Sequence, residues 1–148
     1  MRIAFVSQPW NNTTQPATRA RLVGGMDLWM YEVTRRLSPD NRLVVFARGA
    51  KREVENNIEY RPINHPWERK LMSRLQRLKH KLWPGDSRHP IFASRFYYGA
   101  YILRVALAVR AWRPDVIHIQ NFAQFARIVR FFNPDARIVL HMHCEDFR

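Results

Sequence analysis

Two short apolar runs of this sequence contain histidine, the side chain best suited to acid–base chemistry near neutral pH. The first spans 114–120 and holds His118, and the second spans 137–143 and holds His141 and His143. Each run follows a Pro-Asp turn signal and is rich in Val and Ile, so each predicts a buried β-strand. In an open parallel sheet, ligands bind beyond the carboxyl ends of the strands, where these imidazoles would lie.

A histidine at the end of a strand is also a common hydrogen-bonded core residue. For His118 and His141 this structural role is the simpler interpretation, whereas both roles stay open for His143, which precedes Cys144. A metal site built from His141, His143, Cys144 and Asp146 would lack the spaced ligand pairs of a structural zinc site. We therefore expect no metal.

A second candidate site is the glycine pair Gly24 and Gly25, which opens a predicted helix after the first strand and its loop. Glycine lets backbone N–H groups approach a ligand closely, and a helix N-terminus favours negative charge, so a phosphate or diphosphate is the natural ligand. The spacing matches neither the dinucleotide G-x-G-x-x-G pattern nor the P-loop. A turn with a glycine near the N-cap is the alternative interpretation.

The most basic segment spans 67–95, with eight Lys or Arg against two acidic residues. Its apolar residues recur every three or four positions, which predicts an amphipathic helix over 67–83. The basic residues that flank this apolar stripe are Arg69, Lys70, Arg74, Arg77, Lys79 and Lys81. Such a helix can lie on an anionic membrane surface, or it can pack normally with a solvated basic face. Nucleic-acid binding is not expected, because the chain has no recognised motif and no interleaved stacking aromatics.

The composition agrees with an anionic partner, since 25 basic and 12 acidic residues give a formal net charge of +13. The single cysteine excludes an intramolecular disulfide and fits a reducing compartment. The sequence starts directly with a strand-like run and has no signal-peptide pattern. No apolar stretch approaches the ~20 residues of a membrane span. We expect a cytoplasmic protein, with any membrane contact peripheral and on the inner face of the plasma membrane.

Alternating strand and helix patterns predict an α/β fold with a parallel sheet and flanking helices. The strands are expected over 2–7, 42–47, 57–62, 114–120 and 137–143, and the helices over 24–37, 67–83, 91–112 and 122–132. A length of 148 residues fits one domain, with residues 66–95 as a basic helical insertion. No carboxylates are paired for acid–base work, because Glu53, Glu55 and Glu59 lie in a mixed-charge region and are expected to be solvated.

The ordered set of segments resembles the N-terminal, acceptor-side domain of a retaining glycosyltransferase of the GT-B fold, of the family-4 type. Residues 1–7 resemble the family's first strand, and 24–37 resemble its "G-G-x-E … L-A-x-x-L" helix. Residues 113–120 resemble the "K-P-D-V-V-H-x-H" strand, and 138–143 resemble the strand that closes in "T-x-H". The chain departs from the family at Gln120, where a second histidine is common, and at 40–42, which replace a "G-H-x-V" entry.

The resemblance implies a Rossmann-like domain that holds the acceptor and faces a second domain, which binds most of a nucleotide-sugar. Gly24 and Gly25 would offer backbone amides to the donor diphosphate. His143 would touch the donor sugar near the transferred carbon and is the catalytic candidate. The candidates for lining the acceptor cleft are His118, Gln120 and Asn121. No cofactor is expected beyond the nucleotide-sugar substrate.

No two glutamates of this chain are eight residues apart, so the family's donor-side E-x₇-E motif is missing. We therefore expect a fragment, a separately encoded subunit completed by a partner, or a decayed remnant, with no transfer activity in isolation. The acceptor would be a cell-surface glycan or a lipid-linked molecule. The alternative is a non-enzymatic α/β module that docks through its basic helix on an anionic membrane or on a protein partner.

Overall fold

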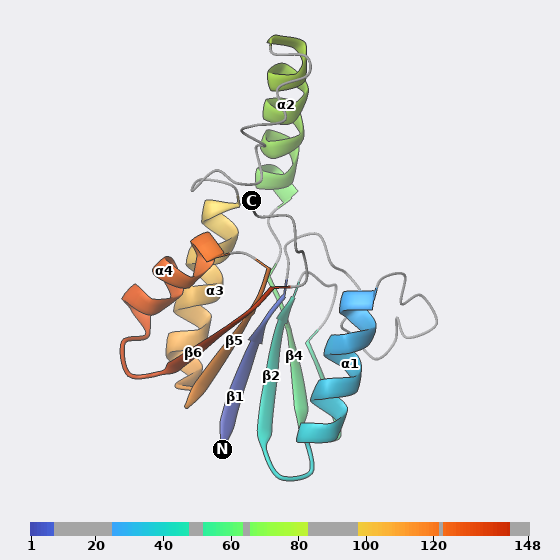
Figure 1. Ribbon diagram of the computed structural model, residues 1–148, viewed down its shortest axis with the longest axis vertical. Helices are drawn as coiled ribbons and strands as arrows, with labels where there is room; N and C mark the ends of the chain where they lie inside the picture. Colours follow the sequence, from blue (N-terminus) through green and yellow to red (C-terminus); the bar gives the residue numbers. More distant parts are fainter. Residues whose placement is uncertain (8–24, 48–51, 64–65, 83–97, 122, 143–148) are drawn as a thin grey trace.

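The computed structural model describes residues 1–7, 25–47, 52–63, 66–82, 98–121 and 123–142, and strands and helices alternate along much of this part of the chain (Figure 1). The strands are β1 (Arg2–Val6), β2 (Arg42–Ala47), β3 (Glu53–Glu55), β4 (Ile58–Pro62), β5 (Val116–Gln120) and β6 (Arg137–His141). The helices are α1 (Gly25–Leu37), α2 (Pro66–Leu82), α3 (Gly99–Trp112) and α4 (Ala123–Phe132).

The strands form one sheet in the order β3-β4-β2-β1-β5-β6. All neighbouring pairs in this sheet are parallel except β3 and β4, which are antiparallel. The chain adds strands outward from β1 through β2 to β4, and then returns to the other side of β1 for β5 and β6. The strand order therefore reverses between β1 and β5, as in doubly wound Rossmann-like sheets. The predicted α/β fold with a mainly parallel sheet is confirmed.

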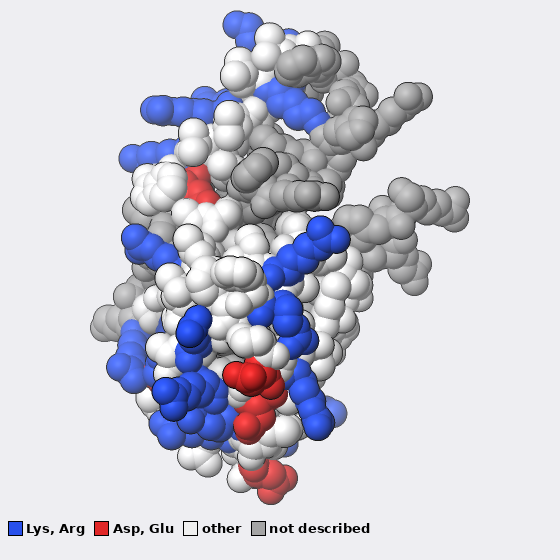
Figure 2. All heavy atoms as spheres, turned by 90° about the vertical axis from the view of Figure 1, so that its left-hand side faces the viewer, with Lys and Arg blue, Asp and Glu red and all other residues white. Residues whose placement is uncertain are grey.

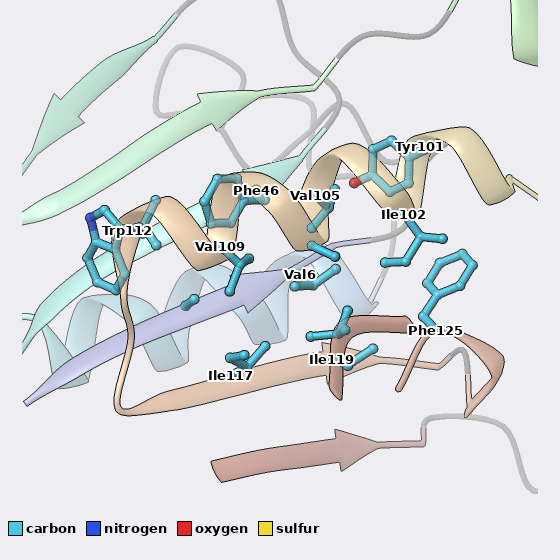
Figure 3. Packing of buried hydrophobic residues seen from close by; sticks show 14 of the residues in the cluster. Val6, Phe46, Tyr101, Ile102, Val105, Val109, Trp112, Ile117, Ile119 and Phe125 are labelled. Carbon is cyan, nitrogen blue, oxygen red and sulfur yellow. The ribbon is translucent and has the colours of Figure 1, made fainter. Parts of the chain in front are cut away.

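Helices cover both faces of the sheet (Figure 1). Alternate residues of a strand point to opposite faces, so Ile3 and Phe5 of β1 pack with Met30 of α1, while Ala4 and Val6 pack with α3 and α4. Figure 3 shows the second layer, in which α3 lies over β1 and β5. Because parallel strands are covered on both sides, their residues read as continuous apolar runs in the sequence.

Two sequence expectations need correction. Residues 53–55 form the edge strand β3, although no strand was expected there. Helix α3 begins at Gly99, because Tyr98 adopts a left-handed backbone conformation with φ 53°. The part of the predicted helix over 91–97 lies outside the described residues. The other predicted strands and helices are present, and their bounds lie within two residues of the expected ones where the structure describes them.

Glu59 was expected to be solvated, and this expectation is wrong. Its side chain is largely buried on β4, where Nε of Arg61 and Nε of Arg52 each donate a hydrogen bond of 2.7 Å to Oε1. Partial burial alone would raise the pKa of the Glu59 carboxyl, but the guanidinium groups of Arg61 and Arg52 outweigh it and lower the pKa below its ordinary value of 4.5.

Glu59→Gln should therefore destabilise the protein at pH 7 by about 2 kcal/mol, the usual range for hydrogen bonds to a charged group. A carboxyl whose folded-state pKa is lowered stabilises the fold above its unfolded-state pKa, and this contribution disappears as the pH falls through the folded-state value. Urea unfolding measures this effect. The free energies of unfolding of wild type and variant should differ more at pH 7 than at pH 3. A difference that does not change with pH would contradict this account.

Candidate functional site

The candidate site lies at the carboxyl ends of the central strands, beside the reversal of strand order between β1 and β5. Helix α1 begins at this same end of the sheet (Figure 1). Ligands of doubly wound sheets bind in the crevice at this position. On β5, the alternation places Val116, His118 and Gln120 on the face covered by α1, since Ile117 and Ile119 belong to the opposite layer.

Four rings from four different elements meet on this face. We call Phe5, Trp29, His118 and His141 the imidazole cluster. The His118 ring lies 5.2 Å from Phe5, 5.3 Å from Trp29 and 5.5 Å from His141, measured between ring centroids. The Trp29 and His141 rings are closest, at 4.3 Å and 81°. His118, His141 and Trp29 are half-buried, so the cluster combines an aromatic surface with imidazole nitrogens at the edge of the core.

A buried polar pair lies next to the imidazole cluster. Val6 is the register partner of Ile119, so the next residues along, Ser7 and Gln120, are neighbours on the same face. Both side chains are 1% exposed. The Gln120 amide nitrogen is 3.7 Å from the sulfur of Met30, while Gln120 Oε1 and Ser7 Oγ are buried with no hydrogen-bond partner in the described part of the chain. Two such acceptors together can hold a ligand hydroxyl or a bound water.

Replacing Gln120 should reveal what this polar pair contributes. A buried carbonyl oxygen without a partner costs about 1–3 kcal/mol. Gln120→Met has a similar volume and no such oxygen, so it should raise the free energy of unfolding by about 1 kcal/mol in urea titrations. A loss of stability would contradict this and would indicate a buried water that binds both side chains.

Asn121 has a backbone role at the site. It adopts a left-handed conformation with φ 63°, which asparagine tolerates better than most residues, and it ends β5. Its backbone N–H donates a hydrogen bond of 2.8 Å to the carbonyl oxygen of His141. Asn121 therefore joins the ends of β5 and β6 and fixes the position of His141 relative to His118.

The structure brings together only part of the predicted site. His118, Gln120 and Asn121 lie at the end of β5, beside His141 of β6. Gly24 and His143 lie outside the described residues. Gly25 begins α1, but its surroundings are not described. Within the described residues, no three His, Cys, Asp or Glu side chains gather as metal ligands do.

Three contributors to the site were not singled out in the sequence, Phe5, Trp29 and Ser7. Trp29 is in the first turns of α1, four residues after Gly25, so a helix that begins at the ligand end of the sheet carries it toward β5 and β6. Ser7 is a polar residue at the end of an apolar strand. The position of Trp29 near the start of its helix and that of Ser7 at the end of its strand are both visible in the sequence. Neither position indicates a functional site until the strand order is known.

The predicted basic residues form a separate region on α2. Lys70, Arg74, Arg77, Lys79 and Lys81 lie on this helix, which projects past the carboxyl ends of the strands (Figures 1 and 2). Arg69 is on the same helix, but its side chain is not among those described. Among the helices that the structure describes, none combines the length and the apolar character of a membrane span.

No protein-family model matches the chain, and a comparison with curated proteins finds no relative.

Proposed function

We propose that this chain is the acceptor-side domain of a retaining glycosyltransferase of the GT-B type, which transfers a sugar from a nucleotide-sugar to a cell-surface glycan or lipid-linked acceptor. The supporting observation is the convergence of His118, His141, Trp29 and Gln120 at the reversal of strand order. This is the position at which a doubly wound domain binds its ligand.

The chemistry of these side chains suits a sugar. An indole ring packs against the apolar face of a pyranose, and an imidazole and an amide exchange hydrogen bonds with its hydroxyls. The N-terminus of α1 at this end of the sheet favours the negative charge of a diphosphate. Hydrogen-bond donors fixed in a water-poor cleft would stabilise the charge that develops on the departing diphosphate.

In this proposal His143 contacts the donor sugar, as the resemblance implies. The donor-binding half of the enzyme is supplied by a second domain of the same chain or by a partner subunit. Without this donor-binding half, the chain of 148 residues should bind ligands more weakly than the completed enzyme and should not turn over a nucleotide-sugar.

Imidazole NMR signals provide the test. We would titrate the ¹⁵N-labelled protein with UDP-glucose, UDP-N-acetylglucosamine and GDP-mannose, and then with a cell-wall oligosaccharide mixture. At least one ligand should shift the His118 and His141 signals together. Trp29→Ala should weaken that binding about tenfold, the effect of losing roughly 1.4 kcal/mol of stacking and burial.

Trp67→Ala serves as the matched control, because Trp67 is an exposed tryptophan on α2 and does not belong to the imidazole cluster. It should leave the titration unchanged. The proposal fails if no ligand in millimolar amounts shifts the two imidazoles, or if Trp67→Ala weakens binding as much as Trp29→Ala.

A further inference from the structure

Helix α2 presents an apolar stripe to solvent. At about 100° per residue, its five members fall within about 80° of arc. They are Trp67, Leu71, Leu75, Leu78 and Leu82. Their side chains are between 40% and 55% exposed, although a stripe with this spacing normally faces a core. The helix is therefore amphipathic, and its apolar side is largely exposed to solvent.

A basic row runs beside this stripe. Lys70, Arg74, Arg77 and Lys81 repeat the same spacing and fall within about 60° of arc on one flank. All four are exposed. The only acidic residue in α2 is Glu68, which is buried. Among the described residues, no carboxylate forms an ion pair with these four side chains, so this part of the chain does not neutralise the positive charge of the row.

The base of α2 is fixed to the core. The Glu68 carboxylate accepts hydrogen bonds of 2.8 Å each from the backbone N–H groups of Ala100 and Tyr101, in the first turn of α3. Met72 packs against the layer formed by α3 and α4. Beyond these contacts the helix extends past the sheet (Figure 1). The stripe is thus held in a defined orientation relative to the carboxyl ends of the strands.

We infer that α2 docks on an anionic phospholipid surface, with the stripe buried at the boundary of headgroups and acyl chains and the basic row on the lipid phosphates. A helix with an apolar face, a lysine- and arginine-rich flank and a tryptophan has the composition of interfacial helices. Long basic side chains can reach the headgroups while their stems lie along the apolar surface.

A second copy of the chain is a poorer occupant of the stripe. Two α2 helices packed through their stripes would bring two basic rows onto one helix pair, and like charges repel. An anionic bilayer neutralises the row and covers the stripe at the same time. The inference stands whether or not the chain transfers a sugar, and with the proposed function it would place the site beside a membrane-borne acceptor.

Vesicle co-sedimentation tests the inference. The full chain should bind vesicles of phosphatidylcholine and phosphatidylglycerol (7:3) and bind pure phosphatidylcholine weakly, and added salt should lower its affinity. Each basic side chain near the surface contributes about 1 kcal/mol, so the triple variant Arg74→Glu, Arg77→Glu, Lys81→Glu should bind at least 100-fold more weakly. Leu71→Ser with Leu75→Ser and Leu78→Ser should also lose binding, while circular dichroism reports whether each variant is folded.

The matched control changes the net charge of the protein by the same amount, but at residues outside α2. Arg104, Arg127 and Arg137 are exposed and lie outside α2, on α3, α4 and β6 respectively. Their triple change to Glu should alter vesicle affinity less than tenfold. Equal losses in both charge variants would overturn the inference, because net charge alone would then explain binding. Absence of binding, or a dimer in sedimentation velocity that the leucine variant abolishes, would overturn it as well.

Discussion

Tyr101→Ala is expected to lower the free energy of unfolding by about 4 kcal/mol, as replacing a fully buried ring by alanine usually does. Tyr101 is 1% exposed and is the largest fully buried side chain among the described residues. It lies in the layer between α3 and the sheet with Ile102, Val105 and Phe125 (Figure 3). Removing its ring leaves a cavity that the surrounding strands cannot close, because they are held by their ladder hydrogen bonds.

Tyr101→Phe removes only the hydroxyl, so it separates the contribution of the hydroxyl to stability from that of the ring. Burial raises the pKa of the Tyr101 hydroxyl, so it stays protonated and donates a hydrogen bond of 3.0 Å to the Ser7 carbonyl oxygen. Losing this one bond should cost about 1 kcal/mol. Leu103→Ala, at an exposed position of the same helix, should cost less than about 1 kcal/mol.

Urea unfolding followed by circular dichroism measures all three variants. The expected ranking is Tyr101→Ala well above Tyr101→Phe, with Leu103→Ala smallest. If Tyr101→Phe cost as much as Tyr101→Ala, the hydroxyl rather than the packing of the ring would dominate. If Tyr101→Ala matched Leu103→Ala, the assignment of Tyr101 to the core would be wrong.

The sheet could be predicted from the sequence because burial on both faces leaves a direct signal. Residues 43–46 and 116–119 are nearly continuous apolar runs with β-branched residues, and Pro-Asp turns precede β5 and β6. The alternation of such runs with helical patterns predicts parallel pairing. The strand β3 carries no such signal, since it has three residues and two of them are glutamates.

Burial of charged and amphipathic residues could not be predicted in the same way. The buried Glu59 carboxylate accepts hydrogen bonds from Arg61 on its own strand and from Arg52, which precedes β3 and is seven residues earlier. The stripe of α2 has the spacing of a core-facing helix, and periodicity does not say whether a partner covers it. Both outcomes depend on which segments the fold brings together.

The candidate site was predictable at the level of strands and not of contacts. Strand ends identified His118, Gln120 and Asn121, because ligands gather at the carboxyl edge of parallel sheets. The contribution of Trp29 depends on how α1 packs on the sheet, because this packing brings its ring to His118 and His141, and no local pattern encodes it. That α2 contributes no residue to this cluster also depends on the packing. Sugar binding and membrane docking are therefore assigned to two different regions of the protein.

Glu68→Ala should have the second-largest effect on stability, about 3 kcal/mol. The carboxylate is 3% exposed and accepts two backbone N–H groups that the first turn of α3 leaves without an internal partner. Hydrogen bonds to a charged acceptor stabilise by about 1.5–3 kcal/mol, and a carboxylate at a helix N-terminus also interacts favourably with the helix dipole. Alanine would leave the amide of Tyr101 buried without an acceptor.

Glu68→Gln keeps one good acceptor oxygen and removes the charge, so it should cost about 1 kcal/mol. Glu32→Ala is the control on the surface, since its ion pairs with Arg35 and Arg36 at 3.6 and 3.8 Å are exposed to solvent and should be worth less than about 1 kcal/mol. Urea unfolding gives the three values in one set of titrations.

Hydrogen exchange shows where the loss arises. In Glu68→Ala the amides of Ala100 and Tyr101 should exchange much faster than in wild type, while the amides of β1 and β5 should accelerate only with global unfolding. The stripe and basic row of α2 remain in this variant, so its affinity for anionic vesicles should change less than tenfold. Slow exchange at Ala100 and Tyr101 in the variant would show that Glu68 does not hold α2 on α3. The orientation of the stripe would then need another cause.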